Sequence, residues 1–137
     1  MAEVISVRVA TLRPRGYDSL RAWLDADTKH VYIGRTNRHV DGARESKWHN
    51  PFPLRNEKDR DDCLGRYAEY LLGRKDLVSC ISELDGCVLG CWCHPLGCHG
   101  DVLCALAKGV KQGLAPEKIL APFIAKKHSA TSTSTTK

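Results

Sequence analysis

Five of the seven cysteines lie within the eighteen residues Cys87–Cys104, and this stretch constrains the fold more than any other. Its first part, residues 87–93, is apolar or thiol-bearing at almost every position, which predicts a buried β-strand. Pro95 and Gly97 then mark a loop, and helical spacing follows over about 100–109. Strands that are apolar on both faces are typical of the interior of a parallel sheet. The stretch therefore predicts the centre of an α/β domain.

The rest of the chain carries weaker signals of strands and helices. β-Branched residues predict further strands at about 3–10 and 29–34. Helical spacing predicts helices at about 19–25, 59–73, 76–84 and from Pro116, the last one interrupted by Pro122. We expect one α/β domain over residues 1–125, with a small, mostly parallel sheet of three to five strands, and a disordered Ser/Thr/Lys tail at 126–137.

The composition is that of an ordinary globular domain, with 42% hydrophobic and 27% charged residues in 137. The net charge of +5 includes three lysines in residues 126–137; elsewhere 18 basic residues face 16 acidic ones. Electrostatics therefore gives only weak support for nucleic-acid binding. An odd number of cysteines without a signal peptide favours thiols in the cytoplasm, and no apolar run has the roughly 20 residues of a membrane span.

Residues 35–54 have neither a strand nor a helix period. The segment is rich in basic residues and ends in Lys47–Pro53, whose two prolines favour an extended path. Loops of this length inside a compact domain are uncommon and are often functional. One interpretation is an anion-binding loop that covers a ligand, and the other is a surface loop fixed by a buried Trp48.

One interpretation of the cysteine stretch is a zinc site. Alternate residues of a strand share a face, so Cys91 and Cys93 point the same way, and Cys98 and His99 follow after a short loop. These four residues, or His94 in place of His99, have the ligand types that zinc prefers. The spacing lacks the paired Cys-x2-Cys units of most structural zinc sites, so the metal stays an alternative.

Two other interpretations involve no metal. In one, the dipole of the following helix and the imidazole of His99 lower the pKa of the Cys98 thiol, which suits a nucleophile or an anion site. In the other, the cysteines are packing residues and Asp101 is a helix cap. The sequence leaves both open.

Two blocks of the sequence resemble a known family: Ser46–Phe52, and Leu89–Leu103 with its Cys-Trp-Cys-His-Pro and Cys-His-Gly-Asp-Val-Leu motifs. Over about residues 28–108 the chain resembles domain of unknown function 4326, a family of small phage, viral and bacterial proteins. One departure is His49, where we expect a small residue. Distant similarity to other small proteins with a cysteine-bearing strand implies a Rossmann-like sheet. The resemblance also implies that the two blocks face each other.

These features predict a pocket for a nucleotide or another phosphorylated small molecule, because ligands of open α/β sheets bind at the carboxyl ends of strands and at helix N-termini. Whether the protein also acts on its ligand is left open. The expected reactive residues are Cys98, His99 and Asp101, and the expected ligand contacts are Arg35, Arg44, Lys47, Trp48, Asn50, Cys93 and Gly100. No cofactor is expected. The alternative is a zinc-stabilised, non-catalytic module for nucleic acid or protein, with Cys91, Cys93, Cys98 and His99 as ligands.

Overall fold

The computed structural model describes residues 2–52, 56–92 and 98–135, without the side chains of residues 57 and 127–135. The elements are β1 (Glu3–Ser6), α1 (Val9–Leu12), η1 (Arg13–Arg15), α2 (Leu20–Ala26), β2 (His30–Tyr32), η2 (Glu57–Asp59), α3 (Arg60–Gly73), α4 (Lys75–Ser79), η3 (Ile81–Leu84), β3 (Val88–Cys91), α5 (His99–Lys111) and α6 (Pro116–Thr135). Among these helices, none is long and apolar enough to cross a membrane.

The three strands form one parallel sheet in the order β1-β3-β2. From Val88 to Gly90, β3 pairs with both neighbours; Gly90, for example, lies opposite Ile5 on one side and Tyr32 on the other. The α/β class, the small parallel sheet and the central position of the cysteine-bearing strand are thereby confirmed. The Rossmann-like arrangement stays a prediction, and Cys93 lies outside the described residues.

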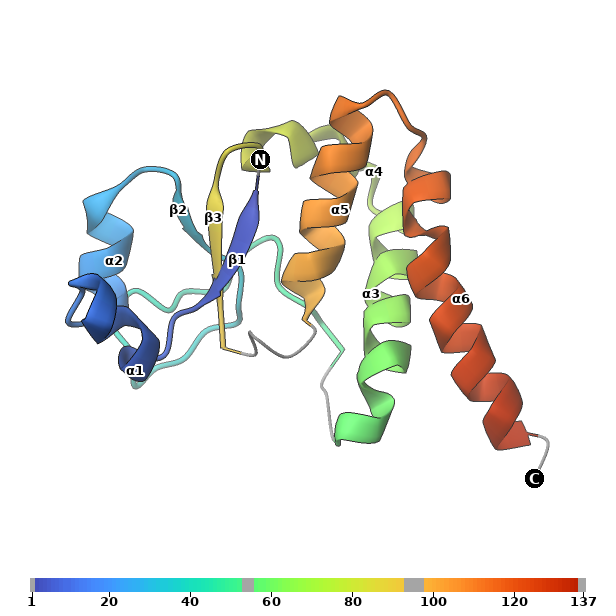
Figure 1. Ribbon diagram of the computed structural model, residues 1–137, viewed down its shortest axis with the longest axis horizontal. Helices are drawn as coiled ribbons and strands as arrows, with labels where there is room; N and C mark the ends of the chain where they lie inside the picture. Colours follow the sequence, from blue (N-terminus) through green and yellow to red (C-terminus); the bar gives the residue numbers. More distant parts are fainter. Residues whose placement is uncertain (1, 53–55, 93–97, 136–137) are drawn as a thin grey trace.

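Helices cover both faces of the sheet (Figure 1): α1 and α2 lie on one side, and α5, α3 and α6 lie on the other. The side chains of β3 alternate accordingly. Leu89 and Cys91 point into the core under α5, whereas Val88 and Trp92 contact the core under α1 and α2. This alternation matches the face assignment expected from strand geometry.

Two glycines permit the close approach of helices to the sheet. A Cβ atom on Gly90 would contact Val7 and lie 2.9 Å from the Trp23 ring, so glycine lets the indole rest directly on β3. A Cβ on Gly100 would lie 2.9 Å from both Val4 and Ile33. Gly100 thus allows the first turn of α5 to pack against the chain at β1 and just after β2.

The first strand is shorter than its β-branched sequence indicates. A strand is expected over 3–10, but β1 ends at Ser6 and a helical turn begins at Val9. The reason is the length of β3: Val7 N–H donates to the Cys91 carbonyl (2.9 Å), and β3 ends there. Without a partner strand the chain turns, and Leu12 becomes fully buried on the α1 and α2 side.

The helix expected over 76–84 is divided in the structure. Lys75–Ser79 is α-helical and Ile81–Leu84 is a 3-10 helix, with Cys80 between them at φ −97° and ψ 0°. The tighter second part still buries its apolar side chains, because Ile81 and Leu84 are each 1% exposed.

The last helix is longer than expected. Pro122 was predicted to interrupt it, but α6 continues through this residue, and that prediction is wrong. A proline removes one backbone hydrogen bond and crowds the preceding turn. Packing against α3 and α5 offsets the cost, because Leu120 is fully buried and Phe123 and Ile124 contact the same core. The α6 backbone enters the stretch 126–137, for which the tail prediction stays untested.

Candidate functional site

A cavity of about 660 Å³ opens at the carboxyl end of the sheet. Tyr32 and Gly34 border it where the chain leaves β2, and Cys91 and Trp92 border it at the end of β3. Its other walls are the N-termini of α5 and α3 and the loop around Asn50. This is the edge at which the sequence predicted a ligand site, since the carboxyl ends of parallel strands meet there.

The described residues that line the cavity include several basic and aromatic ones beside small, neutral and thiol-bearing ones, with no aspartate or glutamate among them. Three arginines line it, Arg35, Arg38 and Arg60, together with the histidines His39 and His99. Such a wall carries a positive potential and favours anionic ligands.

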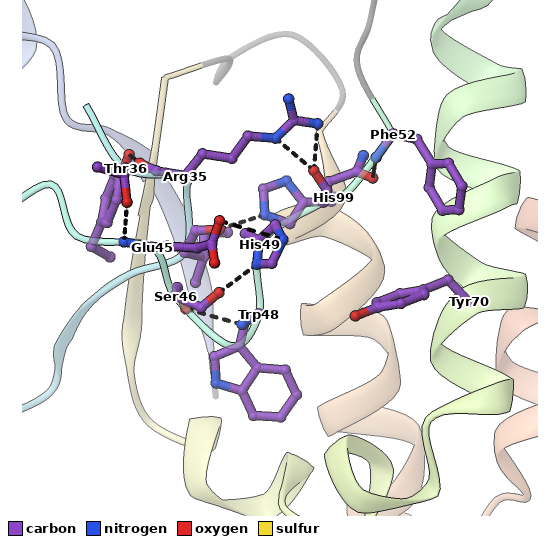
Figure 2. Close-up of polar contacts among 12 residues, drawn as sticks. Arg35, Thr36, Glu45, Ser46, Trp48, His49, Phe52, Tyr70 and His99 are labelled. Carbon is purple, nitrogen blue, oxygen red and sulfur yellow. Dashed lines mark hydrogen bonds and ion pairs between the residues drawn. The ribbon is translucent and has the colours of Figure 1, made fainter. Parts of the chain in front are cut away.

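Arg35 is held in place by a main-chain group. Its Nε and Nη2 donate to the Asn50 carbonyl at 2.8 and 2.6 Å. In Figure 2 its side chain extends above the ring of His99, while the Trp48 indole points away from it. The guanidinium is therefore fixed near His99, the first residue of α5, and together with burial its charge contributes to the lowered pKa of that residue.

Aromatic residues form another part of the wall. Trp92 Nε1 donates to the Tyr32 hydroxyl at 2.9 Å, and the two rings meet edge to face with centroids 6.3 Å apart. The Tyr32 hydroxyl donates in turn to the Arg35 carbonyl at 2.5 Å. Burial raises the pKa of Tyr32, so it remains a hydrogen-bond donor at neutral pH. Phe52 adds a third aromatic side chain.

The predicted contact Asn50 lines the cavity and also shapes the loop. Its side chain accepts from Phe52 N–H at 2.9 Å and donates to Cys63 Sγ at 3.4 Å. The Cys63 thiol donates to the Phe52 carbonyl at 3.3 Å. Asn50 thus connects the loop to α3 beside the cavity.

Lys47, Trp48 and Arg44 were expected to contact the ligand, but they are not among the described residues that line the cavity. The Trp48 ring is 2% exposed and belongs to the core under α5. Its carbonyl accepts a hydrogen bond from the buried Tyr67 hydroxyl at 2.7 Å. Lys47 pairs with Glu83 at 2.5 Å, and its ammonium lies 5.3 Å from the Trp48 ring centre. The structure therefore gives Trp48 the position of an anchor in the core.

Cys98 and Asp101 together cap α5. The Cys98 carbonyl accepts from the Asp101 N–H at 2.9 Å, and the Cys98 N–H donates to Asp101 Oδ2 at 3.1 Å. Cys98 Sγ also lies 3.3 Å from Cys91 Sγ. The hydrogen bond with Cys91, followed by burial, raises the pKa of the Cys98 thiol far above its usual value. This direction is opposite to the lowered pKa that a helix terminus and a neighbouring imidazole predicted, and the cap matches the packing interpretation.

His99 is a neutral hydrogen-bonding residue. Its Nε2 lies 2.7 Å from the Ile33 carbonyl, which requires a proton on Nε2 and leaves Nδ1 as an acceptor. Burial lowers the pKa of His99 to about 4, and the nearby charges of His49 and Arg35 act in the same direction. His99 also lines the cavity.

The comparison with known families agrees with the resemblance carried by the blocks Ser46–Phe52 and Leu89–Leu103. The family model for "Domain of unknown function (DUF4326)" matches residues 20–109. The chain belongs to this family. An uncharacterised protein of Acanthamoeba polyphaga mimivirus is 34% identical over 91 residues, which cover 60% of this chain and 69% of the viral protein. No solved structure is significantly similar to the chain.

The DUF4326 match includes all the described residues that line the cavity, and sequence reasoning missed several of them. Arg38, His39, Arg60, Tyr32 and Trp92 were not expected there. Trp92 carried a usable signal, since it lies beside the thiols at the end of the predicted central strand. Arg60 had none, because its position depends on how α3 packs.

The zinc alternative is not decided for this DUF4326 domain. Within the part of the chain that the structure describes, no group of three or more potential ligands surrounds a common point. Cys93 lies outside that part. Gly100, another expected contact, is buried against the sheet.

Proposed function

We propose that the cavity binds a nucleotide or another phosphorylated small molecule. The observation that carries the proposal is the basic and aromatic wall, without any described acid, at the carboxyl end of a parallel sheet. The N-terminus of α5 also borders the cavity, and helix N-termini favour phosphate. The same arrangement supports a Rossmann-like interpretation of the fold.

The phosphate lies at the arginine side of the cavity in this proposal. Arg35 is already oriented by the Asn50 carbonyl, and its remaining N–H groups face outward from that contact. Arg38 lines the cavity from the same loop, and Arg60 lines it from the start of α3. Phosphate oxygens between guanidinium groups form charge-assisted hydrogen bonds, which are stronger than neutral ones.

The organic part of the ligand lies against Trp92 and Phe52. Stacking of a base on an aromatic ring contributes about 1–3 kcal/mol. His99 Nδ1 supplies a neutral acceptor nearby, which suits an N–H or O–H group of the ligand and disfavours another acceptor. The combination of an anion site, aromatic surfaces and one acceptor supports a nucleotide over a simple sugar phosphate.

The proposal is binding, with catalysis left as a further question. Cys98, expected as the reactive thiol, is protonated at neutral pH and already caps α5. The proposal also includes the expected location of the protein in the cytoplasm.

Calorimetric titration with mono- and dinucleotides, sugar phosphates and inorganic phosphate tests the proposal. Arg38→Gln removes one guanidinium, and the loss of a charged hydrogen bond worth about 1.5–3 kcal/mol weakens binding roughly 10- to 100-fold. Arg66→Gln is the matched control: Arg66 lies on α3, pairs with Asp62 at 3.0 Å and does not line the cavity. Its Kd stays within about twofold of the wild type.

Two results would contradict the proposal. One is the absence of heat with every phosphorylated ligand, and the other is equal weakening by both substitutions. Tight binding of oligonucleotides without binding of mononucleotides would favour the nucleic-acid module instead.

A further inference from the structure

Two buried thiols meet at the base of the cavity. Cys91 is the last residue of β3, Cys98 precedes the first residue of α5, and their sulfur atoms are 3.3 Å apart. Each is 2% exposed, and both line the cavity. The binding proposal assigns no role to this pair.

The geometry of the pair is close to that of a disulfide. A disulfide bond is about 2.05 Å long, so the two sulfur atoms need to approach by a little over 1 Å. Both residues are in the thiol form in the structure. Neither lies inside a helix, so bond formation leaves the hydrogen bonds of α5 intact.

We propose that Cys91 and Cys98 form a dithiol–disulfide redox site, and that its oxidising co-substrate is a low-molecular-weight disulfide bearing carboxylates. The cavity that both residues line gives the co-substrate a route to them. Arg35, Arg38 and Arg60 on the wall complement its carboxylates. This inference is independent of nucleotide binding.

The exchange proceeds in two balanced steps. Cys91, as its thiolate, attacks one sulfur of the small disulfide, so a mixed disulfide forms and one small thiol leaves with the proton that Cys91 lost. Cys98 then attacks the Cys91 sulfur, which forms the protein disulfide and releases the second small thiol with the proton of Cys98. The protein thiols lose two electrons and the small disulfide gains them. Cys91 is the first nucleophile because the Cys98 S–H is placed to donate a hydrogen bond to a thiolate there.

The test oxidises the reduced full-length protein with oxidised glutathione, quenches it with acid, alkylates the remaining thiols and maps the peptides by mass spectrometry. A protease that cleaves after Trp92 and Leu96 separates Cys91 from Cys98. The expected product is a linked pair of these two peptides, with Cys63 and Cys104 still alkylated. The rate of protein oxidation by each small disulfide is divided by the rate at which that disulfide oxidises free dithiothreitol. This normalised rate is at least several-fold higher for oxidised glutathione than for cystamine, a cationic disulfide.

Two variants make the result specific. Cys98→Ser keeps a preferred N-cap residue, so α5 still forms; it yields no linked pair and accumulates a glutathione adduct on Cys91. Cys93→Ser leaves the pair intact. The proposal is overturned if both thiols remain alkylatable under conditions that fully oxidise dithiothreitol, if the bond forms through Cys93 or another cysteine, or if cystamine reacts at the same normalised rate.

Discussion

Replacing Tyr67 by Phe removes the hydrogen bond that ties the loop before α3 to the core. Tyr67 is fully buried in α3, and its hydroxyl donates to the Trp48 carbonyl at 2.7 Å. Phenylalanine fills almost the same volume, so the substitution changes polarity and leaves packing nearly unchanged. The difference in unfolding free energy therefore reports on this one contact.

The expected loss follows from the burial of both partners. A neutral hydrogen bond contributes about 1 kcal/mol net, and an acceptor that stays buried without a donor raises the cost to about 1–3 kcal/mol. Trp48 is 2% exposed, and desolvation strongly raises the pKa of Tyr67, so water does not readily replace the hydroxyl. We expect a loss of about 2 kcal/mol, which for a urea m-value near 2 kcal/mol/M lowers the midpoint by about 1 M.

Tyr70→Phe is the matched control on the same helix. The Tyr70 hydroxyl accepts from Arg74 Nη1 at 2.6 Å, but the residue is only partly buried, and water can replace the lost hydroxyl. Its midpoint changes by less than about 0.3 M, corresponding to roughly 0.5 kcal/mol. Equal midpoints for the two variants would refute the reasoning, since the Trp48 anchor would then contribute no more than a surface contact.

Two further substitutions test the packing of the sheet and the charge state of the site. Gly90→Ala places a methyl group against Trp23 and lowers the unfolding free energy, measured in urea, by about 1–3 kcal/mol. Gly73→Ala is the control, because a Cβ there meets no neighbouring atom within 4 Å, and it does not lower the unfolding free energy. Equal effects of the two substitutions would contradict the close approach of Trp23 to β3. The folded-state pKa of His99 is about 4 against 6.5, so the unfolded chain takes up the proton first as pH falls. Its contribution is complete above pH 6.5 and is lost towards pH 4, at a cost on the order of 3 kcal/mol. In His99→Gln the urea midpoint depends less on pH between 4 and 6.5 than in the wild type. An unchanged pH dependence of the midpoint would contradict the assignment.

The centre of the fold was predictable from the sequence, because one strand is apolar on both faces and therefore needs helices on both sides of the sheet. Residues 87–93 offer no polar face, and a strand of this kind fits only between two neighbours with helices on both sides. The order β1-β3-β2 follows that logic. The sequence indicated a cap at Asp101; in the structure Cys98 is the N-cap residue, and Asp101, three positions later, accepts from its N–H.

The ends of elements were less predictable, because they depend on partners. Nothing within residues 3–10 indicates that pairing stops at Ser6; the end of β3 at Cys91 decides it. Pro122 carries a local preference against helix, and the buried Leu120 and Phe123 beside it determine the outcome. Local patterns record the preference of a segment, and tertiary packing can override it.

The chemical character of the cavity wall was predictable from the sequence, but only some of its residues were. A basic loop beside a helix start indicated an anion site, and Arg35, Asn50, Cys98 and His99 do line the cavity. The same pattern could not separate a tryptophan that faces a ligand from one that fixes a loop. Trp48 is buried, while Trp92 lines the cavity. An indole suits either place, since it combines a large apolar surface with one polar group.

The block Ser46–Phe52 interacts with its surroundings largely through main-chain carbonyls. The Trp48 carbonyl accepts from Tyr67, the Asn50 carbonyl from Arg35, and the Phe52 carbonyl from Cys63. Carbonyl positions depend on the path of the backbone, and Pro51 restricts that path. The block therefore acts as a rigid frame that orients Arg35 over α5, so that the guanidinium is in position before an anion arrives and little conformational entropy is lost on binding.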